Sequence, residues 1–238
     1  IEKENQKIGI IETEYLEIET KVPDKSLGVI RASLAKVLQT QYGLPIADKY
    51  RIRIEPTDDQ NKSEVYLTLS SIGEVVSGAM RVWQPREKDI ELETEMLLKL
   101  MVFLGSERAG AVDRIQTSKI NNQPSAIVET SNGGYVSLIF PYDKEQSWNY
   151  LGWALDELNI DIEDRDLVEG SYFIKVTPSS GFFSKLLSSI SQTNTYQLII
   201  KEVDALKTYV YFVDLSEENK PDTVAYSVKL FNEIASKF

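Results

Sequence analysis

Hydrophobic and polar residues alternate in two 20-residue stretches that align without a gap, Tyr50–Leu69 (YRIRIEPTDDQNKSEVYLTL) and Tyr196–Leu215 (YQLIIKEVDALKTYVYFVDL). The offset is 146 positions, and it pairs Tyr50 with Tyr196, Ile52 with Leu198, Ile54 with Ile200, Leu67 with Val213 and Leu69 with Leu215. Alternation with a period of two predicts β-strands, so each stretch is interpreted as a hairpin. A unit that occurs twice predicts two domains of the same architecture.

The second copy carries a full series of predicted elements. Tyr135–Phe140 is rich in β-branched and aromatic residues, which favours a strand. Apolar residues then recur at the three- and four-residue spacing of one helix face, at Trp148, Leu151, Leu155 and Leu158. The remaining predictions are a short strand beginning at 160–162, a strand at 171–176, a short helix at 183–190, hairpin strands at 196–203 and 209–215, and a closing helix striped by Val224, Val228, Phe231 and Ala235.

The first copy repeats this order from its own first residues. A constant offset of 161 positions matches Ile1 with Ile162, Glu2 with Glu163 and Gly9 with Gly170. A short helix is predicted at 27–38, hairpin strands at 50–55 and 65–69, and a closing helix at 92–103. The counterpart of residues 126–161 does not occur in the first copy. Because a sheet face without its helix exposes a large apolar patch, we expect a further strand and helix upstream in the native protein.

These elements predict an α+β protein with two tandem domains, each an antiparallel sheet with helices packed on one face. The predicted domains are 1–105, truncated at its N-terminus, and 126–238, joined by a polar linker at 106–125 that can include a short helical piece. Ile52 and Ile54 alternate with Arg51 and Arg53, which predicts one covered face. The strand at 209–215 is apolar on both faces, which predicts a central strand or one covered on both sides.

Composition excludes several classes of function. The net charge is −11, and Lys and Arg form no stripe, so nucleic acid is not an expected partner. The chain contains no Cys and no His, which removes disulfides, thiol nucleophiles and imidazole bases. No apolar run is long enough to span a membrane. We expect no cofactor and no metal.

Short motifs do not identify an active site. Ser33 and Lys36 fit a Ser-x-x-Lys pattern, but its companion motifs are missing and both residues fall on the polar side of a predicted helix. The acidic run at 161–169 has Arg165 and Asp166 where a calcium loop needs a ligand and a glycine, which favours a solvated hairpin turn. Nothing marks a particular carboxylate pair for hydrolysis. Asn132-Gly133-Gly134 precedes a strand and predicts a turn.

Aromatic residues away from the helical stripes are the candidates for partner binding. Trp148 lies on an apolar stripe and is predicted to be core. Trp83, Trp153, Phe182 and Phe183 lie off any stripe. Such residues either pin a loop by packing or anchor a protein partner, and the sequence leaves both alternatives open.

Three diffuse stretches carry a family resemblance: residues 50–56 (YRIRIEP), residues 93–97 (ETEML), and residues 148–158 followed by Ile160-Asp161-Ile162. Together with the duplication, they resemble the BamC family, lipoproteins of the outer-membrane β-barrel assembly machinery with two helix-grip domains. The resemblance implies a lipid anchor in the outer membrane and a long segment before the first domain that binds the lipoprotein BamD. Neither the anchor nor that segment is among these 238 residues, and the family has no catalytic residues to carry over.

The leading prediction is therefore a non-catalytic accessory protein of outer-membrane protein assembly that acts as an interaction scaffold. The alternative is a helix-grip domain that binds a small apolar ligand between its long helix and its sheet. A hydrolase, supported by unmarked carboxylates alone, is the weakest hypothesis.

Overall fold

A computed structural model describes residues 1–18, 45–57, 61–77, 80–121, 124–131, 135–176, 193–215 and 221–238. The described chain forms two compact units. Unit 1 comprises Ile1–Asn5 and Gly9–Leu97, and unit 2 comprises Gln6–Ile8 and Leu98–Phe238. Both are built on antiparallel sheets with helices, which confirms the predicted α+β class. The predicted helices at 27–38 and 183–190, with Ser33 and Lys36, fall outside the described residues, as does the predicted turn at 132–134.

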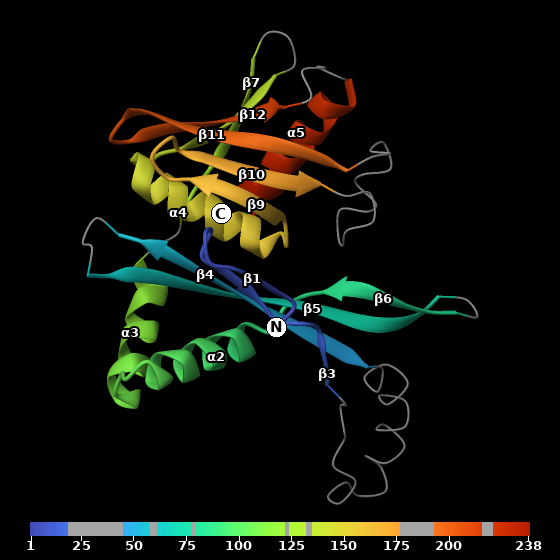
Figure 1. Ribbon diagram of the computed structural model, residues 1–238, viewed down its shortest axis with the longest axis vertical. Helices are drawn as coiled ribbons and strands as arrows, with labels where there is room; N and C mark the ends of the chain where they lie inside the picture. Colours follow the sequence, from blue (N-terminus) through green and yellow to red (C-terminus); the bar gives the residue numbers. More distant parts are fainter. Residues whose placement is uncertain are drawn as a thin grey trace, which may run out of the picture. The chain divides into compact units, whose positions relative to one another are not determined.

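Unit 1 is a sheet in the order β1-β2-β4-β5-β6, with β3 also paired to β4 (Figure 1). Its long β4–β5 hairpin is the first predicted repeat, and α2 is the predicted closing helix. The strands are β1 Lys3–Asn5, β2 Ile10–Glu12, β3 Leu16–Ile18, β4 Ile46–Pro56, β5 Ser63–Ser77 and β6 Met80–Arg86. Helix α2, Ile90–Phe103, belongs to unit 1 as far as Leu97.

Unit 2 is a sheet in the order β7-β8-β12-β11-β10-β9. Helices α4 and α5 contact each other and pack on this sheet, α4 over β11 and α5 over β7 and β8 (Figure 1). The predicted strand at 209–215 is central, between β11 and β8. The elements are α3 Arg108–Asn121, β7 Ile127–Thr130, β8 Val136–Phe140, α4 Lys144–Glu157, β9 Asp161–Asp166, β10 Ser171–Val176, β11 Asn194–Asp204, β12 Lys207–Asp214 and α5 Pro221–Ala235.

One glycine occurs at the same place in both units and supports the duplication. Gly9 and Gly170 have φ of 60° and 68°, a region that side-chain-bearing residues rarely adopt. The carbonyl of Gly9 accepts from the amide of Ile54 at 2.8 Å, and the carbonyl of Gly170 accepts from the amide of Ile200 at the same distance. Because Ile54 and Ile200 are themselves paired in the repeat, the two units share this contact as well as their sequence pattern.

The gapless alignment is wrong in the second strand of the hairpin. Ile54 pairs with Val65 and Ile200 with Val210, so the connection is one residue shorter in unit 2, which also has a bulge between Glu202 and Asp204. The counterpart of Leu67, opposite Ile52, is therefore the residue opposite Leu198, which is Phe212 and not Val213. A slip of one residue exchanges the two faces of a strand, so this correction decides which residues are equivalent.

The covered face of unit 1 also differs from the prediction. Arg53 is fully buried and Arg51 nearly so, whereas Ile54 is 38% exposed. The arginines are buried because each has a charged partner: Arg51 pairs with Glu12, and Arg53 pairs with Glu55. Alternation therefore found the two faces but not which of them is buried, because paired charges can occupy a buried face.

The stretch around Trp83, interpreted as irregular, and the predicted linker both contain regular structure. The stretch around Trp83 is strand β6, where Pro85 is tolerated because an edge strand does not need every N–H. Most of the predicted linker at 106–125 is helix α3, whose Ala, Arg, Gln and Lys residues favour helix without a strong apolar stripe. The predicted domain limits stay a prediction.

Within the described residues, the Ser63–Ser70 part of β5 is paired on one side only. Its other neighbour, β6, pairs with residues 71–77. In unit 2 the corresponding edge of β12 pairs with β8, at residues 208–211. The expectation of a further strand and helix upstream stays a prediction.

Candidate interaction surfaces

The hairpin formed by the end of β5 and by β6 presents Trp83 to solvent. Trp83 lies opposite Glu74 in the strand register, and its side chain is 45% exposed. Arg81 donates to the Glu74 carboxylate at 3.2 Å, so the two charges flank the tryptophan on one face. Of the two predicted partner-binding residues that the structure describes, Trp83 and Trp153, Trp83 is the exposed one.

The next candidate, Trp153, lies in a packed aromatic cluster. Trp153 lies on α4, and its ring is 5.5 Å from the ring of Phe238, which also contacts Phe140 and Tyr150. This aromatic cluster packs the C-terminus against unit 2, so Trp153 has a packing role. Phe182 and Phe183 fall outside the described residues.

Unit 2 carries an aromatic surface on the sheet face that α4 and α5 leave open. Tyr209 and Tyr211 stack with their ring centroids 5.8 Å apart, and Tyr211 is 39% exposed. Lys207 lies 5.0 Å from the Tyr209 ring, and Lys201 lies 5.9 Å from the Tyr211 ring, both at cation–π distance. We name these four residues the tyrosine surface. The apolar alternation of this strand was visible in the sequence, but not which of its faces stays open.

Unit 1 carries buried charges on the equivalent face of its sheet. The Lys49 ammonium contacts Glu12 at 2.7 Å and Glu2 at 2.9 Å, and Arg51 contacts the second oxygen of Glu12 at 2.9 Å. Burial alone would raise the pKa of Glu12, but the charges of Arg51 and Lys49 outweigh it, so this pKa lies below its ordinary value. Such a network holds strands together, and it offers no unpaired acid or base for catalysis.

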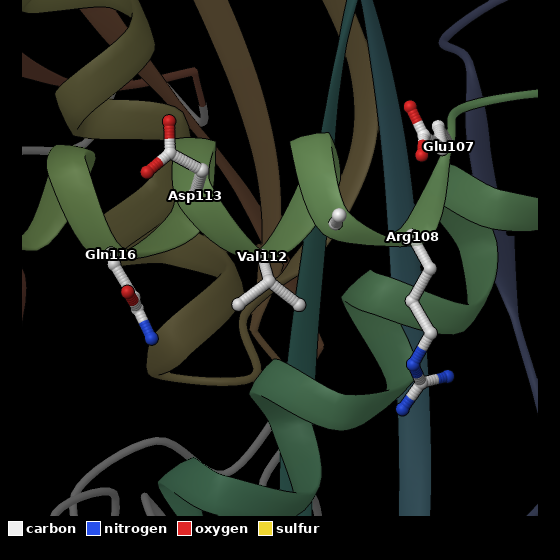
Figure 2. Close-up of a pocket in the computed structure, with 6 residues that line it drawn as sticks. Glu107, Arg108, Val112, Asp113 and Gln116 are labelled. Atoms are coloured by element: carbon white, nitrogen blue, oxygen red, sulfur yellow. The ribbon is translucent and has the colours of Figure 1, made fainter.

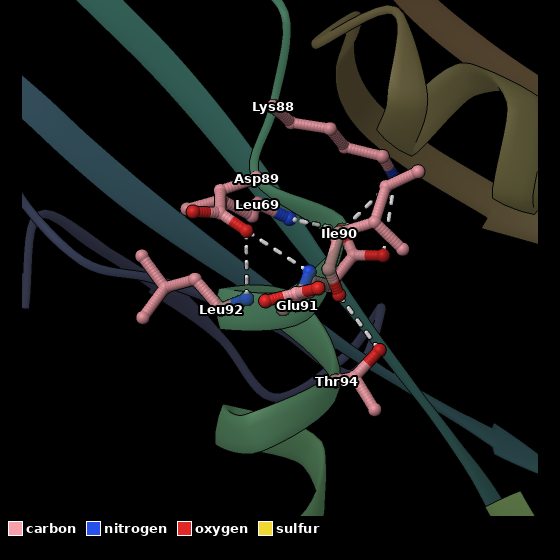
Figure 3. Close-up of polar contacts among 8 residues, drawn as sticks. Leu69, Lys88, Asp89, Ile90, Glu91, Leu92 and Thr94 are labelled. Atoms are coloured by element: carbon pink, nitrogen blue, oxygen red, sulfur yellow. Dashed lines mark hydrogen bonds and ion pairs between the residues drawn. The ribbon is translucent and has the colours of Figure 1, made fainter.

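Helix α2 begins with carboxylates that satisfy backbone amides (Figure 3). The Asp89 side chain accepts from the amides of Glu91 and Leu92 at 3.0 and 3.1 Å, as an N-cap does. Glu93 accepts from the amide of Leu69, on β5, at 2.8 Å and from the Lys88 ammonium. This first turn therefore joins α2 to the sheet of unit 1, and its carboxylates have structural roles.

A surface depression lies along α3, with a volume of about 660 Å³ (Figure 2). All of its lining residues belong to this helix or to the residue before it. In Figure 2 Arg108, Val112 and Gln116 point to one side, and Glu107 and Asp113 to the other. A depression lined from one helix is open to solvent and does not enclose a ligand.

Comparison with known proteins identifies the family. Residues 127–238 match the family described as the outer membrane protein assembly factor BamC-like C-terminal domain. A Thiobacillus denitrificans protein named outer membrane protein assembly factor BamC is 34% identical over 186 residues, which cover 76% of this chain and 48% of that protein. A protein of the same name from Accumulibacter regalis is 32% identical over 234 residues, covering 89% and 60%. The chain belongs to the BamC family.

The residues that match the BamC-like C-terminal domain lie within unit 2 and include the tyrosine surface and α4. Trp83 and the buried charges of unit 1 lie outside that match. The chain spans about half of the length of one of these BamC relatives and three fifths of the other.

In this BamC-family chain aromatic side chains pack between the helices and the sheet in the described part of unit 2. Trp148 stacks on Tyr172 with centroids 4.0 Å apart, and both are buried. Phe212 contacts Tyr196, Tyr226 and Phe231 on the same side of the sheet. The predicted core role of Trp148 is confirmed.

The acidic run and the helices of the described chain bear on two further possibilities, a metal site and a membrane-spanning segment. The acidic run at 161–169 lies on β9 and on the turn that leads to β10, as its sequence predicted. Across the described ranges, no three acidic side chains are grouped closely enough to hold a metal ion. None of the helices described is both long and apolar enough to cross a membrane.

Proposed function

We propose that this chain is part of a non-catalytic accessory lipoprotein that acts as a protein-interaction scaffold in outer-membrane protein assembly. The observation that carries the proposal is the match to relatives named outer membrane protein assembly factor BamC, over 76% and 89% of the chain. The exposed tyrosine surface and the Trp83 hairpin support it, because aromatic residues and arginine are enriched where proteins bind each other.

The proposal also covers where the protein is located in the cell and which proteins it binds. The two units act as tandem helix-grip domains held at the outer membrane by a lipid anchor. The lipoprotein BamD and other components of the assembly machinery are the partners, and BamD binds through a segment outside these 238 residues. Trp83 is the favoured contact within the chain, since Trp153 packs against Phe238.

Binding of a small apolar ligand is less well supported. A helix-grip cavity would lie between the helices and the sheet, where unit 2 has Trp148 stacked on Tyr172. A ligand could enter only by displacing core aromatic side chains, each of which contributes substantially to stability.

Affinity purification tests the proposal. The full-length natural protein, tagged at its C-terminus, is extracted from outer membranes in mild detergent, and the co-purifying assembly components are quantified by mass spectrometry. We expect BamD and its partners in stoichiometric amounts, and only background amounts with an unrelated tagged outer-membrane lipoprotein. Equal recovery of assembly components with both proteins would reject the proposal.

A further inference from the structure

The apolar side of the unit 1 sheet is less covered than the same side of the unit 2 sheet. In unit 2, α4 packs over β11, and Ile200 on that strand is 2% exposed, whereas its counterpart Ile54 is 38% exposed. Tyr172 is fully buried and stacks on Trp148 of α4, whereas its counterpart Ile11 is half-buried. Both differences fall where α4 covers unit 2, and the described part of unit 1 contains no counterpart of α4.

The closing helix of unit 1 is uncovered as well, although α2 and α5 are joined to their sheets at equivalent positions. Glu93 accepts from the amide of Leu69 at 2.8 Å. In unit 2 the Thr223 hydroxyl donates to the Asp214 carboxylate at 2.7 Å. Helix α2 is rich in apolar residues, yet none of its residues is buried. Helix α5, which contacts α4 and β8, buries the side chains of Tyr226, Leu230, Phe231 and Ile234.

The unpaired edge of β5, at Ser63–Ser70, adds backbone groups to this uncovered side. The amide of Ile54 donates to the carbonyl of Gly9, on the side of β4 away from β5. Ile54 lies opposite Val65, so this pair exchanges no hydrogen bonds, and the amide and carbonyl of Val65 point to the open edge. The backbone groups of Leu67, two residues on, point the same way. This edge is therefore a template for one more strand.

Unit 2 shows which strand fits such an edge. Val210 is the counterpart of Val65, because it lies opposite Ile200 as Val65 lies opposite Ile54. Strand β8 pairs antiparallel with β12 and places Leu138 opposite Val210. The Leu138 side chain is fully buried. A strand docked on β5 in the same register runs antiparallel to it and places a buried apolar residue opposite Val65.

The order of the elements indicates where this strand and its helix come from. In unit 2, β8 and α4 directly precede β9, and α4 ends at Glu157, shortly before β9 begins at Asp161. The offset of 161 positions matches Ile1 with Ile162 in β9, so the counterparts of β8 and α4 belong immediately before Ile1. Proteins of this family have room for such a segment, since this chain spans 48% and 60% of the two BamC relatives.

We propose that the open edge of β5 and the uncovered apolar side of unit 1 dock a strand and a helix that precede Ile1 in the full-length protein. The strand pairs with residues 63–66, the counterparts of 208–211, and the helix covers Ile54 and the apolar side of α2. Unit 1 is then closed by its own chain, and this edge is not open to a strand from a partner. The inference concerns how unit 1 is completed and does not rest on the proposed function.

Backbone amide exchange in the full-length natural protein, measured residue by residue by NMR, tests the docking. The amides of Val65 and Leu67 are expected to exchange at least about a hundredfold more slowly than unpaired amides, because a paired amide exchanges only when its strand opens. The amide of Trp83 is the internal control. Trp83 lies opposite Glu74, whose amide donates to the carbonyl of Pro45 on the side away from β6, so the Trp83 amide points outward from the sheet.

The same spectra identify the docked strand. Cross-strand nuclear Overhauser effects from Val65 and Leu67 are expected to reach residues that precede Ile1 in the same molecule. Exchange of Val65 and Leu67 as fast as that of Trp83 would overturn the proposal. Protection that depends on protein concentration would indicate a second copy, and protection that needs added assembly components would indicate a partner's strand. Either result would reject docking by the protein's own chain, and neither would affect the affinity purification that tests the proposed function.

A pair of proline variants of the full-length protein provides a second test. Val65→Pro removes an N–H that points to the open edge, so it is expected to lower the melting temperature by about 4 °C or more if a strand is bound there. Arg81→Pro is the matched control, since Arg81 lies two residues from Trp83 on β6 and its amide also points outward. Equal melting temperatures for the two variants would contradict a docked strand.

Discussion

Replacing Gly170 by alanine tests the contact that the two units share. Gly170 has a φ of 68° at the end of the turn between β9 and β10, and its carbonyl accepts from the amide of Ile200 on β11. A Cβ added here would lie 2.9 Å from the carbonyl oxygen of Ile200 and 2.9 Å from Cε of Lys144. The lysine side chain can move away, but the backbone carbonyl is fixed in a sheet and cannot.

The expected cost has two parts. The left-handed backbone costs an L-residue about 1–2 kcal/mol, and overpacking at a site that cannot relax costs about 1–3 kcal/mol more. We therefore expect Gly170→Ala to lower the free energy of unfolding of unit 2 by about 2–5 kcal/mol, a large share of the roughly 5–15 kcal/mol typical of a domain. Urea unfolding measures it through the fluorescence of Trp148 and Trp153, in a Trp83→Phe background so that the signal comes from unit 2 alone.

Gly105 provides the matched control. Its φ is also positive, at 101°, but a Cβ there would meet no atom within 4 Å. Gly105→Ala should therefore show only the conformational cost, about 1–2 kcal/mol. If Gly170→Ala is no more destabilising than Gly105→Ala, the close approach to Ile200 does not exist in solution and the reasoning fails.

Three further predictions concern caps, charges and core. Asp143 caps α4 by accepting from the amide of Gln146 at 2.8 Å, so Asp143→Ala should cost about 1 kcal/mol in urea unfolding of unit 2. The folded-state pKa of Glu12 is lowered, so its contribution to unit 1 is present at neutral pH and is lost as the pH falls through that pKa, below the ordinary value of 4.5. Glu12→Gln should cost about 1–3 kcal/mol at pH 7 and make acid unfolding shallower, whereas an unchanged acid profile would exclude this role. Trp148→Ala should cost about 3–5 kcal/mol by calorimetry, and less than 1 kcal/mol would contradict its position in the core.

The sequence predicted the elements that depend on local pattern. Alternation located β4 and β11, and helical spacing located α2, α4 and α5, because each of these signals lies within one segment. The pattern failed where a strand forms because a neighbouring strand is available to pair with it. Trp83 and Pro85 contain no clear strand signal, and β6 forms because the end of β5 is available to pair with it.

The candidate surfaces were predictable only in part. For the off-stripe tryptophans at positions 83 and 153 the sequence left packing and partner binding open. Trp83 is exposed, and Trp153 packs against the ring of Phe238, which is 85 residues away in the chain. The tyrosine surface and the buried arginines were missed for a common reason. Alternation separates two faces of a strand, but burial depends on what covers each face, and that information is not local.

The two sheets also show that the register of a shared hairpin does not decide the character of its surface. Arg53 lies opposite Tyr66 in unit 1, with the guanidinium 4.3 Å from the ring, and the equivalent pair in unit 2 is Ile199 opposite Tyr211. The tyrosine is present in both, but in one unit it is covered by a buried cation and in the other it is partly exposed beside Lys201. The corresponding face of this hairpin is thus closed by ion pairs in unit 1 and left partly open in unit 2. Because function depends on such surfaces and not on the fold alone, the two units must be tested separately for partners.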